Sequence, residues 1–169
     1  MEQFLLKHFI ETGLGWAMIG AAAVASLGCC GSARGIRISA AQAAGVMSER
    51  PELFGKMLVL MVLPGTQGFY SFICAILIAL WTGLVGGTAK VSPVIGLCIL
   101  AVGIGTGCVE WRSAIYQGET SAAAINMVAK QSESAGRAII LPALVETYAL
   151  VGLLTSIVLI LFLTKVTVG

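Results

Sequence analysis

The chain has 169 residues, of which 58% are hydrophobic and 11% are charged, and its mean hydropathy is +0.98. A soluble domain carries about 25% charged residues, so this composition excludes a water-soluble globular protein and a disordered tail, and it indicates a membrane protein. It also excludes a nucleic-acid-binding protein, which needs a dense basic face to contact phosphates.

Four nearly charge-free stretches predict four transmembrane helices, because a helix needs about 20 mostly apolar residues to cross a bilayer. In chain order they lie between Glu11 and Arg34, between Lys56 and Lys90, between Lys90 and Glu110, and over residues 139–164. The expected fold class is an all-α membrane protein with four transmembrane helices.

Small residues crowd the first and third predicted helices, with Gly20 and Gly28 in one and Gly103 and Gly107 in the other. Small side chains allow helix backbones to approach closely in lipid. We therefore expect these two helices to form a crowded inner layer. The second and fourth helices carry more Leu, Ile and Phe and are expected to face lipid.

Two short polar segments, residues 48–52 and 130–134, are predicted to be the turns of two helical hairpins. Pro51 supports the first turn because proline breaks a helix. Basic residues accumulate on the cytoplasmic side of membrane proteins, so we expect cytoplasmic turns and both termini outside. Seven of the ten Lys and Arg residues lie on the side of these turns: Arg34, Arg37, Arg50, Lys56, Arg112, Lys130 and Arg137.

The two predicted hairpins resemble each other in sequence. Gly55-Lys56 and Gly136-Arg137 each begin an apolar run, and the two runs are offset by 81 residues. Self-similarity of this kind indicates a duplicated unit. We therefore predict a first hairpin over residues 1–87 and a second over residues 88–169. At this offset Gly65 matches Glu146, so one of the two carboxylates is absent.

Glu146 is a carboxylate in the middle of the fourth predicted span. Such a residue costs about 2.5 to 3.5 kcal/mol on insertion scales and usually marks an ion or proton pathway. Glu146 and Gln117 both lie about 14 to 15 residues from the second turn, or about 21 to 22 Å at about 1.5 Å per residue. Both are therefore expected to face each other near the membrane centre, for ion binding or, alternatively, purely for packing.

One face of the second predicted helix carries Leu63, Thr66, Gln67 and Tyr70, at i, i+3, i+4 and i+7. Hard cations prefer oxygen ligands, and one negative charge among neutral oxygens suits a monovalent cation, whereas Ca²⁺ normally recruits more carboxylates. The neutral oxygens would replace the hydration of a monovalent metal ion but give a proton little. The plainer alternative is that Thr66 and Gln67 only bond a neighbouring helix.

The segments Leu63-Pro64-Gly65-Thr66-Gln67-Gly68-Phe69-Tyr70 and Val145-Glu146-Thr147-Tyr148-Ala149 closely resemble the proteolipid, or K subunit, of bacterial V-type rotary ATPases, especially the sodium-translocating members. The resemblance covers nearly the whole chain. It implies that Na⁺ is the transported ion and that Tyr70 steadies Glu146 by a hydrogen bond. The implied ligands are the Leu63 carbonyl, side-chain oxygens of Thr66, Gln67 and Gln117, and the Glu146 carboxylate.

The resemblance also implies the partners. Identical subunits would form a closed ring in the bacterial cell membrane, turning past a stator membrane subunit and contacting cytoplasmic central-stalk subunits. The chain would hold no catalytic site, because ATP hydrolysis belongs to partner subunits. The nearest alternative is the same ring carrying protons.

Two alternatives come from other classes. One is a small four-helix antiporter that exchanges protons for a cationic drug; it would line its site with Trp and Tyr for cation–π contacts, whereas Trp16, Trp81 and Trp111 are expected far from the level of Glu146. The other is a structural scaffold, which has no need for Glu146 opposite Gln117.

Glu110 and Arg112 depart from the family pattern, because an apolar or small residue is expected there. Glu110 is expected about 10 Å from Gln117 along the helix, too far to be a sixth ligand. It is expected to pair with an arginine of a neighbouring helix or to contact lipid that fills the ring lumen.

Overall fold

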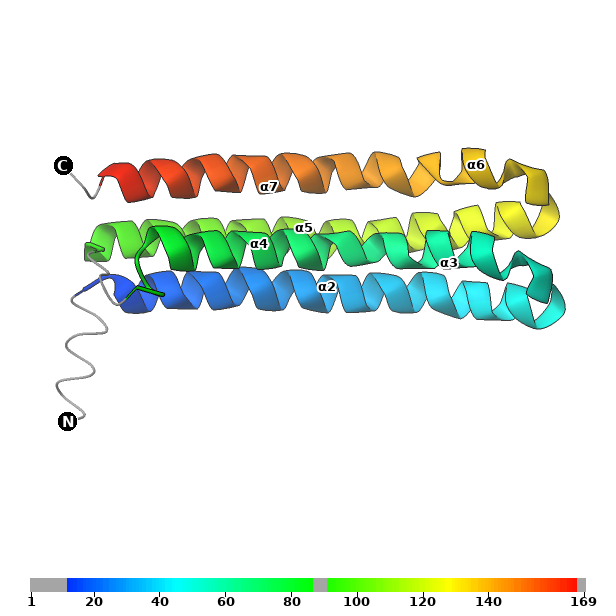
Figure 1. The fold of residues 1–169 in the computed structure, drawn as a ribbon, viewed down its shortest axis with the longest axis horizontal. Helices are drawn as coiled ribbons and strands as arrows, with labels where there is room; N and C mark the ends of the chain where they lie inside the picture. The colour runs from blue at the N-terminus through cyan, green and yellow to red at the C-terminus, as the bar shows by residue number, and fades with distance from the viewer. Residues whose placement is uncertain (1–11, 87–90, 167–169) are drawn as a thin grey trace.

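The computed structural model describes residues 12–86 and 91–166, and its long helices lie side by side (Figure 1). The first hairpin consists of α2 (Leu14–Glu49), the 3₁₀ turn η1 (Pro51–Leu53), α3 (Phe54–Val62), the 3₁₀ turn η2 (Leu63–Gly65) and α4 (Thr66–Trp81). The second consists of α5 (Pro93–Lys130), the 3₁₀ turn η3 (Ser132–Ser134), α6 (Ala135–Ala138) and α7 (Ile140–Val166).

Four helical stretches of the described chain are long and apolar enough to cross a membrane, which confirms the predicted fold class. α2 and α5 continue beyond the charge-free stretches, because helical backbone hydrogen bonding does not require apolar side chains. They end at the predicted turns, where the backbone leaves the helical conformation at Arg50 and Gln131. Both turns therefore lie at one end of the molecule, opposite the described ends of the chain (Figure 1).

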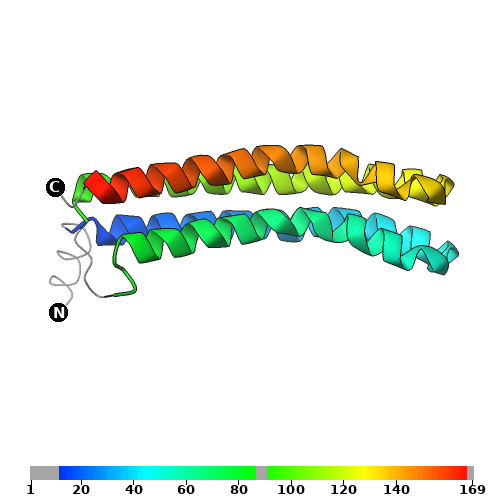
Figure 2. The same cartoon turned by 45° about the horizontal axis from the view of Figure 1, so that its top comes forward.

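The helices form two layers, with α2 beside α4 and α5 beside α7 (Figure 2). The layers are joined most closely where α5 packs on α2. A Cβ atom on Gly103 would lie 2.3 Å from the Gly20 carbonyl oxygen, and one on Gly118 would lie 2.4 Å from that of Gly35. No side chain fits at such distances, so the predicted close packing of these two helices is confirmed.

The glycine contacts also repeat along the helices. Gly20 and Gly103 are 83 residues apart, as are Gly35 and Gly118. The two helices therefore meet through equivalent positions of the two hairpins. Large apolar side chains are exposed on α4 and α7, as expected for lipid-facing helices; Phe69, Phe72, Leu154 and Phe162 are among them.

Candidate functional site

The Glu146 carboxylate lies part-way along α7 and is half-buried against α4 and α5. The Tyr70 hydroxyl of α4 donates a hydrogen bond to Glu146 Oε1 at 2.6 Å. Gln117 Nε2 of α5 donates to Glu146 Oε2 at 3.3 Å. Each carboxylate oxygen thus has its own donor from a different helix. Hydrogen bonds to an ionised acceptor are stronger than those between neutral groups, so this arrangement can hold the charged form of Glu146.

Gln67 and Gln117 form a fully buried amide pair behind the carboxylate. Gln67 Nε2 donates to Gln117 Oε1 at 2.6 Å, and Gln117 Nε2 donates to the Pro142 carbonyl oxygen at 3.1 Å. Gln117 therefore contacts both α4 and α7. Because a buried amide that loses a partner pays its desolvation cost, these contacts fix the orientation of Gln117 toward Glu146.

Pro64 interrupts the helix beside this pair. Proline has no backbone N–H to donate, and residues 63–65 adopt a 3₁₀ turn between α3 and α4. The Thr66 hydroxyl donates to the Leu63 carbonyl oxygen at 3.0 Å, and Thr66 Oγ1 lies 3.4 Å from Gln67 Oε1. The interruption thereby places two further neutral oxygens, from Leu63 and Thr66, next to the amide pair.

The structure brings all six predicted site residues into one hydrogen-bonded network. It runs from the Leu63 carbonyl through Thr66, Gln67 and Gln117 to Glu146 and Tyr70. The network contains one carboxylate among neutral oxygens. No group of three or more His, Cys, Asp or Glu side chains gathers anywhere in the described part of the chain, so the described residues offer no multi-carboxylate site for a divalent ion.

Sequence reasoning missed two side chains that support this network. Ser113 Oγ lies 3.5 Å from Gln67 Nε2, and Ser32 Oγ of α2 accepts a 2.7 Å hydrogen bond from the Gly68 backbone N–H. Ser113 lies four residues before Gln117, so helical periodicity could have placed it on the same face. The pairing of Ser32 with α4 depends on how the helices pack, and no local pattern indicates it.

Both expectations for Glu110 are wrong. Its side chain is 0% exposed within a single chain, so lipid does not reach it. Neither carboxyl oxygen has a hydrogen-bond partner among the described residues, so it does not pair with an arginine of a neighbouring described helix. Among residues 12–86 and 91–166 the one ion pair joins Arg50 and Glu52. Arg112 instead lies over the Tyr116 ring, with its guanidinium 5.4 Å from the ring centroid and donating to the Tyr116 hydroxyl at 3.1 Å. Both interactions stay on the exposed side of α5.

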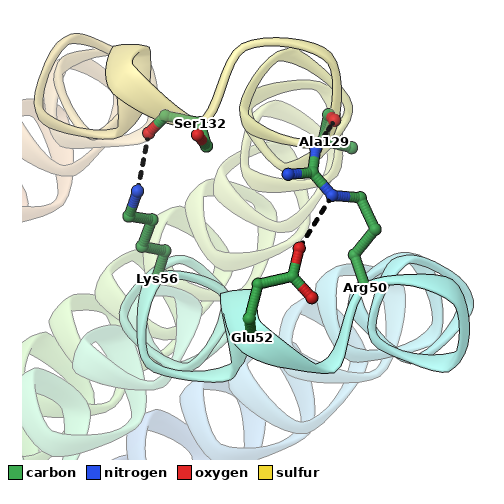
Figure 3. A network of polar contacts seen from close by, with 5 residues as sticks. All are labelled: Arg50, Glu52, Lys56, Ala129 and Ser132. Carbon is green, nitrogen blue, oxygen red and sulfur yellow. Dashed lines mark hydrogen bonds and ion pairs between the residues drawn. The ribbon is translucent and has the colours of Figure 1, made fainter.

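A second polar region joins the two hairpin turns (Figure 3). Arg50 Nη1 donates to the Ala129 carbonyl oxygen at 2.6 Å, and Lys56 Nζ donates to the Ser132 carbonyl oxygen at 2.9 Å. Arg50 Nε also contacts Glu52 Oε1 at 3.0 Å. The Arg50 bond to Ala129 caps the end of α5, and the bonds from Arg50 and Lys56 join the two turns into one polar tip.

Comparisons with known proteins place this network in context. The sequence model of the ATP synthase C-subunit family matches residues 14–78 and 94–159, one range in each hairpin. The chain is 37% identical over 149 residues to the V-type sodium ATPase subunit K of Enterococcus hirae, covering 88% of this chain and 92% of that protein. It is 35% identical over 151 residues to the A-type ATP synthase subunit K of Methanocaldococcus jannaschii, covering 89% of this chain and 64% of that protein.

Proposed function

Because the chain belongs to the ATP synthase C-subunit family, whose members form rings of identical subunits in rotary ATPases, we propose that it carries Na⁺ across the membrane in a V-type ATPase. The observation that carries this proposal is the single carboxylate of Glu146, joined by hydrogen bonds to neutral oxygens inside a multi-pass membrane bundle. Membership of this family argues against the two other classes considered, a small four-helix antiporter and a structural scaffold.

The ligand set supports Na⁺ as the ion. We propose that the Leu63 carbonyl, the side-chain oxygens of Thr66, Gln67 and Gln117, and the Glu146 carboxylate bind it. Oxygens clustered around Thr66 at 3.0 and 3.4 Å can replace water around a hard cation, whereas a proton needs the carboxylate alone. The name of the Enterococcus hirae relative, a sodium ATPase subunit, supports the same choice. The same ring carrying protons is the alternative.

Glu146 is proposed to alternate between two states as the ring turns. With Na⁺ bound, the site is neutral overall and can pass through lipid, where an unpaired charge is costly. Release leaves a carboxylate that the Tyr70 hydroxyl and the Gln117 amide stabilise through their hydrogen bonds. A stator membrane subunit would supply the paths by which the ion enters and leaves. The chain itself supplies the ion site, and nucleotide hydrolysis belongs to partner subunits.

The polar tip is proposed to face the cytoplasm and to contact the central stalk. A groove of about 450 Å³ lies there, lined by Arg50, Lys130, Gln131, Ser132, Glu133, Ser134 and Arg137. Its three cations agree with the positive-inside rule, and both hairpins contribute hydrogen-bonding groups to the tip. The two hairpins, residues 1–87 and 88–169, are proposed to derive from one duplicated unit; the two separate family matches support this.

Transport by the complete ATPase complex in lipid vesicles tests the proposal. Wild-type complex should take up radioactive sodium when ATP is added, and the Glu146→Gln complex should assemble its ring but take up none. The variant removes the negative charge while keeping nearly the same side-chain shape. Sodium uptake by the variant at the wild-type rate would contradict the proposal, and ATP-driven proton uptake by the wild type without Na⁺ would favour the proton alternative.

A further inference from the structure

Glu110 is an acidic residue within the membrane-spanning part of α5. It lies outside the ion site around Glu146. Its side chain is 0% exposed, and neither carboxyl oxygen has a hydrogen-bond partner among the described residues. Because the burial is complete within one chain, ring assembly cannot bring a partner to it. A buried acid without a hydrogen-bond partner is unusual, since buried polar groups are normally hydrogen-bonded.

Groups of α4 and α7 lie near Glu110. On α4, the Tyr70 hydroxyl and the Cys74 thiol lie within range of electrostatic interaction with the Glu110 carboxyl. On α7, a Cβ atom added to Gly152 would lie 3.6 Å from Glu110 Oε1. Of the basic side chains, Arg112 is the nearest along the chain, and it contacts the Tyr116 hydroxyl on the exposed side of α5. No described cation therefore compensates a charge on Glu110.

These surroundings decide which occupant Glu110 accepts. Burying an unpaired carboxylate is strongly unfavourable, because no surrounding group replaces its hydration. A metal ion would need several oxygen ligands, and no described side chain lies within hydrogen-bond distance of the carboxyl oxygens. A proton neutralises the group without any further ligand. It is therefore the occupant that fits the site.

We propose that Glu110 is a second proton-binding site of the subunit, separate from the Glu146 ion site and occupied by a proton at neutral pH. The Tyr70 hydroxyl bonds Glu146 Oε1 at 2.6 Å, and the Glu110 carboxyl lies close enough to Tyr70 to act on it electrostatically. Glu146 and Glu110 would thus have different roles in each subunit. One exchanges the transported ion, and the other stores a proton inside the bundle.

Infrared spectroscopy tests the proposal independently of which ion Glu146 carries. The full-length chain is reconstituted as its ring in lipid at pH 7, in a Glu146→Gln background that removes the ion-site acid. The absorption of a protonated carboxylic C=O group should remain, although glutamate in water ionises at a pKa of about 4.3. It should fall when Glu110→Gln is added, because the C=O group of a protonated Glu110 is then lost. Glu133→Gln, at the exposed hairpin turn, is the control and should leave the absorption unchanged.

Two results would overturn the proposal: no protonated-acid absorption in the Glu146→Gln ring, or the same absorption after Glu110→Gln is added. If the double variant fails to assemble, Glu110→Asp keeps an acid at the position and should shift the absorption rather than remove it. An absorption that Glu110→Asp leaves unshifted would also contradict the assignment.

Discussion

Gln117→Ala is expected to weaken Na⁺ binding at Glu146 more than any other neutral substitution of the site. Gln117 accepts a hydrogen bond from Gln67 at 2.6 Å and donates to Glu146 at 3.3 Å and to the Pro142 carbonyl at 3.1 Å. Truncation to alanine removes all three contacts at once. It also removes one proposed oxygen ligand and the donor that holds one carboxylate oxygen.

The size of the effect follows from the bond to the carboxylate. A hydrogen bond to a charged group contributes about 1.5 to 3 kcal/mol, and about 1.4 kcal/mol corresponds to a tenfold change in affinity. The Na⁺ affinity should therefore fall by about ten- to hundredfold. The glutamine is fully buried, so water cannot readily replace the lost donor.

Equilibrium binding of radioactive sodium to the purified ring measures this change. Ser121→Ala is the matched control, because Ser121 lies one turn further along α5, is also buried, and its hydroxyl has no partner among the described residues. The control should bind Na⁺ within about twofold of wild type. If Gln117→Ala also binds within twofold, or if Ser121→Ala loses as much affinity, Gln117 does not act on the ion as argued.

Three further predictions concern other parts of the molecule. Tyr70→Phe removes the 2.6 Å bond to Glu146 and should weaken Na⁺ binding by about tenfold or more; unchanged binding in the same assay would show that the hydroxyl is dispensable. Gly103→Ala places a Cβ atom 2.3 Å from an α2 carbonyl oxygen and should destabilise the chain by about 1 to 3 kcal/mol. Gly105→Ala, where nothing lies within 4 Å, should not, and equal thermal stability of the two variants would argue against close α2–α5 packing. Cysteine in place of Ser132 should react with a membrane-impermeant maleimide from the cytoplasmic side, and labelling from outside would reverse the topology.

Much of the architecture could be predicted because the bilayer imposes strong constraints on sequence. Charge-free stretches locate the spans. Pro51 predicts a turn, and in the structure it begins the 3₁₀ turn between α2 and α3. The depth of a residue in the membrane could also be estimated, since a helix rises by a fixed amount per residue. This estimate puts Glu146 and Gln117 at one level, and the two are hydrogen-bonded in the structure. The roles of the site residues as ion ligands remain a prediction.

The remaining features depend on three-dimensional packing. The Gln67–Gln117 amide pair joins residues 50 positions apart, and helical periodicity within one segment cannot indicate such a partner. The glycines of α2 and α5 indicate close packing, but their pairing at an offset of 83 residues appears only when the helices are aligned. An arginine or lipid is the expected neighbour of Glu110 because charge is rarely buried alone. Its burial within one chain depends on how the helices pack together, and no local sequence pattern indicates it.

The most direct test of the central claim is protection of Glu146 by Na⁺ against a hydrophobic carbodiimide, which reacts with the protonated acid. Modification is followed by mass spectrometry of the peptide that contains Glu146, so that reaction at any other acid is counted separately. Because Na⁺ binding requires the deprotonated carboxylate, millimolar Na⁺ should slow the modification at fixed pH, K⁺ should do so poorly, and Gln67→Ala should weaken the protection. If Na⁺ gives no protection at any pH where the reagent works, Glu146 carries protons and the sodium assignment is wrong.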